Sequence, residues 1–211
     1  LYLYDLGSGR LKHPITSGEW CVWELLHFDR ERRELLFTAG GRIAGRDPYY
    51  REICCVQIDT GNISTLASSN HDHVVLTPGD RSLLMLSHYT DTSEIQGVSP
   101  TGRYCVETYA RADTVPTSVL RNREGEVVAE LETADISELP QDWQWPEPVK
   151  LLAADGKTDI HGLVFRPSDL DPTRAHPVLD YMYGGPQIAW VPKGSFNDWF
   201  NRFRYSQAAA L

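Results

Sequence analysis

Two sets of strand-like segments repeat along residues 1–133, and this repeat constrains the fold more than any other feature. The first set is "CVWELLHF", "RELLFTAG", "YYREICCVQID" and "GNISTLA", and the second set is "EIQGVSP", "GRYCVETYA", "PTSVLRN" and "GEVVAEL". Four-stranded units that recur about every 40 to 50 residues are typical of β-propeller blades. A β-sandwich also has many short strands, but it does not predict that two sets resemble each other. We therefore favour a propeller over a sandwich.

The segments around these sets bring the count to two or three blades. "LYLYD" and "RLKHPIT" flank Gly7-Ser8-Gly9, where glycines supply the positive φ that a tight hairpin turn needs. Residues 70–92 hold at least one more strand pair, which is either an inserted hairpin or a degenerate blade. A closed ring generally needs about four to eight blades. We therefore expect a partial propeller, in a chain that begins inside a folded domain.

A different pattern follows residue 133. The segment "SELPQDWQWPEP" is rich in proline, which favours an extended path, so residues 134–148 are expected to be a linker. Within 149–211, "VKLLAADG" and "DIHGLVFRP" predict a hairpin and "HPVLDYMYGG" predicts an apolar strand. "SFNDWFNRFRYSQAAAL" predicts a helix that Ser195 would cap. Strands followed by a helix open an α/β domain, and we expect the chain to end within that helix.

Charge and hydropathy argue against nucleic-acid binding and against a membrane-spanning segment. The chain has 29 acidic and 20 basic residues, without a cluster of Lys or Arg. It therefore lacks the basic patch that binding to nucleic acid requires, and we predict no nucleic-acid partner. No apolar run approaches the roughly 20 residues that cross a bilayer. We predict no membrane segment in this chain.

Cysteine and histidine spacing gives no sign of a metal site. The chain has four cysteines, Cys21, Cys54, Cys55 and Cys105. None has C-x-x-C spacing, so we interpret them as small buried hydrophobic residues, with the adjacent Cys54 and Cys55 on opposite faces of a strand. His71 and His73 in "HDH" have no partner cluster at zinc-like spacing, so a polar loop is expected there. We predict neither a metal nor a cofactor.

The sequence contains no complete catalytic set. The G-x-S-x-G elbow that presents a nucleophilic serine in α/β-hydrolases is absent, as are the Walker and dinucleotide-binding glycine motifs. Tyr183 is the remaining candidate, because it lies at the end of a predicted strand directly before Gly184-Gly185-Pro186. It is either a packed tyrosine below a glycine turn, or a hydroxyl donor to a carbonyl oxygen that gains negative charge during acyl transfer.

The order of these segments resembles the prolyl oligopeptidase family of serine peptidases, and within it the dipeptidyl peptidase IV branch. The resemblance rests on the two blade sets, the Pro/Trp linker, "DGKTDIHGLVFRP" and "HPVLDYMYGGP" in this order. It implies a mainly β fold in which residues 1–133 are the C-terminal part of a β-propeller. Residues 134–148 would be the linker, and residues 149–211 would be the first strands and first helix of an α/β-hydrolase catalytic domain.

The resemblance also assigns a role to the glycine turn. In this branch the tyrosine of the Y-[AG]-G-P turn supplies its hydroxyl to the oxyanion hole, and the matching residues here are Tyr183, Gly184, Gly185 and Pro186. The family's Ser, Asp and His follow such a turn and would lie beyond Leu211. The glutamate pair that holds the substrate's amino group would lie before Leu1. We therefore expect this chain to be an inactive fragment.

The parent protein is then expected to be a serine exopeptidase that releases N-terminal dipeptides with Pro or Ala in second position, acting on short peptides. One alternative is an acylaminoacyl peptidase or oligopeptidase of the same family. A second alternative is a non-catalytic propeller module that binds proteins. A homodimer is possible, through residues 70–92 or through exposed strand edges. The compartment stays open between cytoplasm and periplasm.

Overall fold

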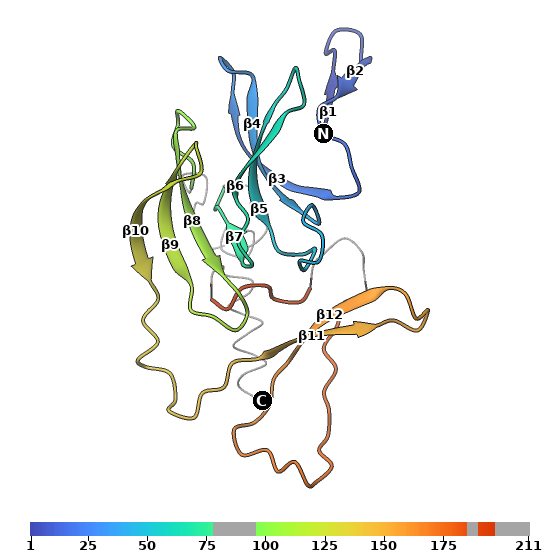
Figure 1. The fold of residues 1–211 in the computed structure, drawn as a ribbon, viewed down its shortest axis with the longest axis vertical. Coiled ribbons are helices and arrows are strands. Elements are labelled where there is room, and N and C mark those ends of the chain that lie inside the picture. Colours follow the sequence, from blue (N-terminus) through green and yellow to red (C-terminus); the bar gives the residue numbers. More distant parts are fainter. Residues whose placement is uncertain (78–95, 185–189, 197–211) are drawn as a thin grey trace.

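The computed structural model describes residues 1–77, 96–184 and 190–196 (Figure 1). Its strands are β1 (Tyr2–Tyr4), β2 (Leu11–Pro14), β3 (Cys21–Asp29), β4 (Glu34–Gly40), β5 (Glu52–Gln57), β6 (Ile63–Ala67), β7 (Asp72–Val74), β8 (Tyr104–Ala110), β9 (Thr117–Asn122), β10 (Val127–Thr133), β11 (Glu147–Leu152) and β12 (Asp159–Val164). The described residues contain no helix. The helix predicted after Ser195 falls on residues 197–211, outside the described part of the chain.

The first sheet is a four-stranded antiparallel meander in the order β3-β4-β5-β6. All four strands predicted for the first set are therefore confirmed. Side chains alternate along β4 between two clusters, with Leu36 in one and Phe37 in the other. Cys54 and Cys55 also face these two different clusters, as predicted. Cys21, by contrast, is exposed, so its interpretation as a buried residue was wrong.

The second sheet has the order β10-β9-β8-β7, and its first strand differs from the prediction. β7 pairs with the C-terminal end of β8, while Val98, from the predicted strand "EIQGVSP", forms only an isolated bridge to Cys105 near the start of β8. Residues 78–95 lie outside the described residues. The polar loop expected at "HDH" is wrong, because Asp72 and His73 lie in β7 and are buried. Burial is possible because charged partners, described below, face both side chains.

The two sheets stack face to face. One core cluster joins Leu36, Ile53 and Leu66 of the first sheet to Cys105 of the second sheet and to Val75 and Val98, which lie outside its strands. The β9–β10 turn also meets the first sheet at Gly125, where φ is 90° and an added Cβ would lie 2.9 Å from the Leu66 carbonyl oxygen. A glycine is needed there on both counts. Stacked four-stranded meanders are the arrangement of neighbouring propeller blades, so the chain contains a partial β-propeller.

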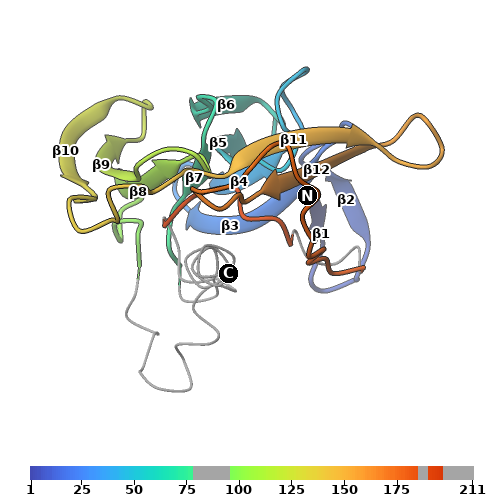
Figure 2. The same ribbon diagram turned by 90° about the horizontal axis from the view of Figure 1, so that it is seen from below.

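The β1–β2 hairpin covers the other face of the first sheet. Leu1 and Leu3 pack against the cluster that contains Phe37, and the Ile15 amide donates a hydrogen bond of 2.9 Å to the Leu1 carbonyl. Figures 1 and 2 both show this hairpin and the second sheet on opposite sides of the first sheet. The predicted hairpin is confirmed.

The C-terminal part contains one hairpin and one failed strand. β11 and β12 pair in an unbroken antiparallel register from Glu147↔Val164 to Leu152↔Asp159, as predicted. Seen from below, this hairpin crosses the end of the first sheet (Figure 2). The strand predicted for "HPVLDYMYGG" is wrong, because residues 176–184 form no strand. No described strand runs beside this segment to satisfy its backbone N–H and C=O groups, so its apolar pattern alone does not produce a ladder.

Candidate functional site

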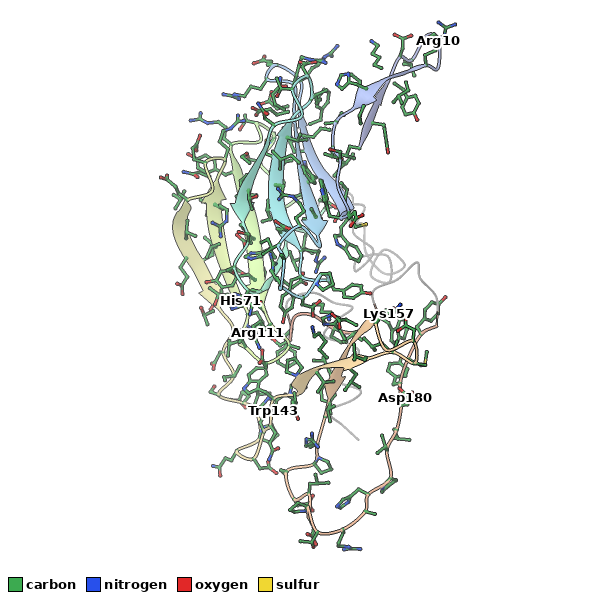
Figure 3. All side chains as sticks on the ribbon, turned by 45° about the vertical axis from the view of Figure 1, so that its right-hand side comes forward. Arg10, His71, Arg111, Trp143, Lys157 and Asp180 are labelled. Carbon is green, nitrogen blue, oxygen red and sulfur yellow. The ribbon has the colours of Figure 1, made fainter. Side chains whose placement is uncertain are left out.

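The candidate site lies where the two sheets meet the C-terminal part. We call this region the junction; it consists of the β4–β5 loop (residues 41–51), the β8–β9 loop (residues 111–116), the β11–β12 hairpin and residues 190–196. Figure 3 shows His71 and Arg111 at the end of the second sheet that faces the hairpin, and Arg10 at the opposite end of the molecule. A groove of about 560 Å³ runs between the β4–β5 loop and the hairpin, and Arg111, Pro192 and Lys193 also line it.

Asp47 of the β4–β5 loop joins three parts of the junction. Lys193 Nζ donates a hydrogen bond of 2.7 Å to Asp47 Oδ2, and His161 Nδ1 of β12 lies 3.3 Å from the same oxygen. Tyr49 completes the group, because Lys193 Nζ lies 5.1 Å from its ring centroid and the His161 ring meets it edge-on at 5.9 Å. A cation that is largely removed from water thus has a carboxylate and an aromatic face as partners.

Two further contacts hold the residues after Lys193. The Ser195 side chain is fully buried, and its hydroxyl donates a hydrogen bond of 2.6 Å to the Thr114 carbonyl in the β8–β9 loop. The Phe196 ring lies 6.4 Å from both Trp143 and Trp145 of the proline-rich segment. Residues 193–196 are therefore anchored to the first sheet, to the second sheet and to the connection that precedes β11.

Buried charged groups link the β4–β5 loop to β7, and β8 to its neighbours β7 and β9. The Arg51 backbone amide and guanidinium donate to the Asp72 carboxylate at 2.7 to 3.0 Å. Burial raises the pKa of the Asp72 carboxyl, but the charge and hydrogen bonds of Arg51 outweigh it, so this pKa lies below its usual value. Glu107 of β8 accepts hydrogen bonds from His73 and Arg121. These bonds likewise outweigh the burial that raises its pKa, so the pKa of Glu107 is also lowered.

Tyr183 lies at the end of the segment that forms no strand. Its side chain is 45% exposed, and its ring stacks on Trp190 at a centroid distance of 5.2 Å and an interplanar angle of 27°. Tyr181 meets the same indole edge-on at 5.5 Å. The structure thus brings the predicted site tyrosine next to the start of residues 190–196. Of its turn, Gly184 is described, while Gly185 and Pro186 lie outside the described residues.

Sequence reasoning missed Trp190, which contacts Tyr183, and the residues that hold the junction together. Trp190, Lys193, Asp47, Tyr49 and His161 come from three separate segments, so no local motif unites them. One signal was available, which is a lysine within the otherwise uncharged segment "IAWVPKGSF" that follows the glycine turn. A charged residue that becomes buried usually needs an opposite charge, but the sequence alone does not indicate which acidic residue supplies it.

The chemical groups of this region can bind and orient, but they do not form a complete hydrolytic centre. Within the described ranges no three His, Cys, Asp or Glu side chains gather as metal ligands. Ser195 donates its hydroxyl proton to a backbone carbonyl, which leaves it in a structural position. The phenol of Tyr183 is a hydrogen-bond donor that can reach an external oxygen from its partly exposed position. Across the described part of the chain, no helix has the length and apolar character that crossing a membrane demands.

Comparison with known proteins agrees with this architecture. Two relatives, each named "Probable dipeptidyl-aminopeptidase B", from Aspergillus fumigatus and Neosartorya fischeri, are 27% identical to 82% of the chain. The chain spans only 17% of the length of each. The solved structure of Porphyromonas gingivalis dipeptidyl peptidase 4 matches 99% of this chain and 26% of that chain, with a TM-score of 0.62 and 21% identity, which supports the fold alone.

The family model for the dipeptidyl peptidase IV (DPP IV) N-terminal region matches residues 1–116, which is more than half of the chain. This range contains the β1–β2 hairpin, the whole first sheet and the strands β7 and β8 of the second sheet. The resemblance expected from the order of the segments is confirmed. The chain therefore belongs to the dipeptidyl peptidase IV family.

Proposed function

We propose that this chain is a section of a serine-type exopeptidase that releases N-terminal dipeptides, with Pro or Ala in second position. Membership of the dipeptidyl peptidase IV family and the names of the two fungal relatives support a peptidase. The observation that carries the proposal is the place of Tyr183, a partly exposed phenol directly before a glycine turn and beside the junction. Residues 134–148 would connect the propeller to a hydrolase domain that begins at residue 149.

In this proposal Tyr183 acts as an oxyanion donor. The serine oxygen of the parent enzyme attacks the carbonyl carbon of the second substrate residue while a histidine takes the serine proton. The carbonyl oxygen becomes negative and accepts a hydrogen bond from the Tyr183 hydroxyl. When the C–N bond breaks, the histidine returns the proton to the leaving amine, and water then hydrolyses the acyl-enzyme. The serine, aspartate and histidine do not belong to these 211 residues, so the chain by itself is expected to be inactive.

In this proposal the propeller selects substrates by their size. The hydrolase domain would begin at residue 149, so the groove between the β4–β5 loop and the β11–β12 hairpin would lie between the propeller and that domain. A propeller in this place would act as a lid that admits short peptides and excludes folded proteins. This lid would make the enzyme an exopeptidase rather than a general protease.

The full-length protein tests the proposal with the chromogenic substrate Ala-Pro-p-nitroanilide. We expect Tyr183→Phe to lower kcat/KM by roughly 10² to 10³, since it removes one donor to the oxyanion. Tyr181→Phe is the matched control, because Tyr181 also contacts Trp190, and it should leave kcat/KM within about twofold. Equal activity of wild type and Tyr183→Phe would exclude this role. Cleavage of acetyl-Ala-p-nitroanilide in place of the free dipeptide substrate would favour the acylaminoacyl peptidase.

A further inference from the structure

We propose that Trp190 is a positioning residue for the Tyr183 hydroxyl, and that Asp47 of the propeller holds Trp190 in place through Lys193. This inference rests on the proposed role of Tyr183 and adds the residues that set its orientation. It assigns to the propeller a direct mechanical part in the oxyanion site, in addition to its part as a lid.

The first step is the contact between the two rings. Trp190 presents the face of its indole to the phenol of Tyr183, at 5.2 Å and 27°, and receives the edge of Tyr181 at 5.5 Å and 60°. Stacked and edge-on rings of this kind restrict each other's rotation. Because residues 176–184 are not fixed by a strand ladder, ring contacts contribute more to the orientation of Tyr183 here than they would in a sheet.

The second step is the attachment of Trp190 itself. Lys193 follows three residues later, and such a span reaches at most about 10 to 11 Å. Lys193 and Ser195 are both buried, and they bond to Asp47 and to the Thr114 carbonyl respectively. A short connection to an anchored residue limits how far the indole can move. The position of Trp190 is thereby tied to loops of both sheets.

The third step is the role of Asp47, whose carboxylate is shared by two C-terminal segments. Asp47 receives Lys193 from the residues beside Trp190 and His161 from the β11–β12 hairpin, so one carboxylate connects the propeller to both C-terminal segments. If this carboxylate is lost, Lys193 retains the face of Tyr49 but has no opposite charge in the β4–β5 loop. Residues 190–193 then gain freedom, and a displacement of about 1 Å in a catalytic group can lower a rate by up to about 10².

A double-mutant cycle in the full-length protein tests whether Trp190 acts through the Tyr183 hydroxyl. We expect Trp190→Ala to lower kcat about tenfold with KM within about twofold, and Trp190→Phe to retain most of the activity. In the Tyr183→Phe background, Trp190→Ala should change kcat less than about twofold, because the group that it positions is already absent. Equal losses in both backgrounds, or no loss in either, would overturn the proposal.

The Asp47 step has its own comparison. Asp47→Asn should reproduce part of the Trp190→Ala loss in kcat, and this loss should also disappear in the Tyr183→Phe background. The matched control is Asp5→Asn, which alters an exposed pair with Lys12 at the far end of the molecule and should leave kcat unchanged. An Asp47→Asn effect that persists in full without the Tyr183 hydroxyl would refute the connection.

A spectroscopic measurement separates this inference from the proposed function. With 3-fluorotyrosine at position 183, the fluorine resonance should shift and narrow in Trp190→Ala and in Lys193→Met, as the ring loses its indole neighbour and rotates faster. Trp20→Ala removes an indole that stacks on Phe37 in the first sheet, and it should leave the resonance unchanged. If neither Trp190→Ala nor Lys193→Met moves the resonance, the proposal is overturned even if the enzyme is active. A shift without dipeptidase activity in the wild type would sustain the ring contact and reject the proposed function.

Discussion

In the first sheet, β4 has a strand on each side, and its side chains alternate between two buried clusters. Residues 176–184 are also rich in apolar side chains, but they pair with no described strand, and Val178, Leu179 and Met182 are exposed. The two regions differ in their neighbours more than in their composition. An apolar segment forms a strand only where another strand can accept its backbone hydrogen bonds.

Residues 190–196 are held by specific side-chain contacts, without a strand ladder of their own. The first sheet combines three strand pairings with two core clusters, so its stability is distributed over many residues. The attachment of residues 190–196 depends on the Lys193–Asp47 pair, on the Ser195–Thr114 hydrogen bond and on the rings around Phe196. Such contacts involve single side chains, so a substitution can remove one of them without disturbing the two sheets.

The largest expected difference comes from truncating one apolar side chain in each region. Phe37 is fully buried, so Phe37→Ala should lower the free energy of unfolding by about 4 kcal/mol. Met182 is 69% exposed, and Met182→Ala should change it by less than about 0.5 kcal/mol. Urea unfolding followed by circular dichroism measures both values. A large loss in Met182→Ala would mean that residues 176–184 are packed, and the contrast between the regions would fail.

The same contrast explains which features could be predicted from the sequence. Nearly all strands of the two sheets were predictable, because alternation and turn residues act locally. β7 was not, because Asp72 and His73 look like loop residues until Arg51 and Glu107 are placed beside them. Tyr183 could be selected through the Y-G-G-P motif, whereas Trp190 and Asp47 meet only in the folded chain. Long-range charge and ring contacts are the part that a local pattern does not contain.

The second expected effect concerns the charges buried in the second sheet. Asp72→Asn leaves Arg51 opposite a neutral amide, and we expect it to lower the free energy of unfolding by about 3 kcal/mol. The matched control is Asp59→Asn, because Asp59 also pairs with an arginine but at an exposed site. It should lower the free energy by less than about 1 kcal/mol. Similar losses at both sites would show that burial adds nothing to the Arg51–Asp72 pair.

Acid should reveal the same charges without mutation. The pKa values of Asp72 and Glu107 are lowered in the folded state, so the unfolded state binds more protons as the pH falls. Their contribution to stability is complete above the unfolded pKa values of about 4 and is lost as the pH drops through the lower folded values. The melting temperature should therefore fall between about pH 5 and pH 2, and less steeply in Asp72→Asn. An equally steep fall in the variant would assign the acid sensitivity to other groups.

The smallest expected effect compares two lysines of the C-terminal part that both pair with aspartate. The Lys193 side chain is 10% exposed and reaches Asp47 across the junction, whereas the Lys150 side chain is 62% exposed and pairs with Asp159 within its own hairpin. Lys193→Met should lower the free energy of local opening at the junction by about 1 to 2 kcal/mol, since a charge-assisted hydrogen bond is lost from a partly dry site. Lys150→Met should change it by less than about 0.5 kcal/mol, because water replaces an exposed pair at little cost.

Hydrogen exchange of the β11–β12 amides reports both values, since these amides exchange whenever the hairpin opens. Lys193→Met removes one of the two contacts that Asp47 makes with the C-terminal part. The Asp47 side chain then holds His161 of β12 less firmly, so exchange of the hairpin amides should accelerate in Lys193→Met alone. Equal acceleration in both variants would instead mean that the Lys193–Asp47 pair contributes no more to the stability of the hairpin than the exposed Lys150–Asp159 pair does.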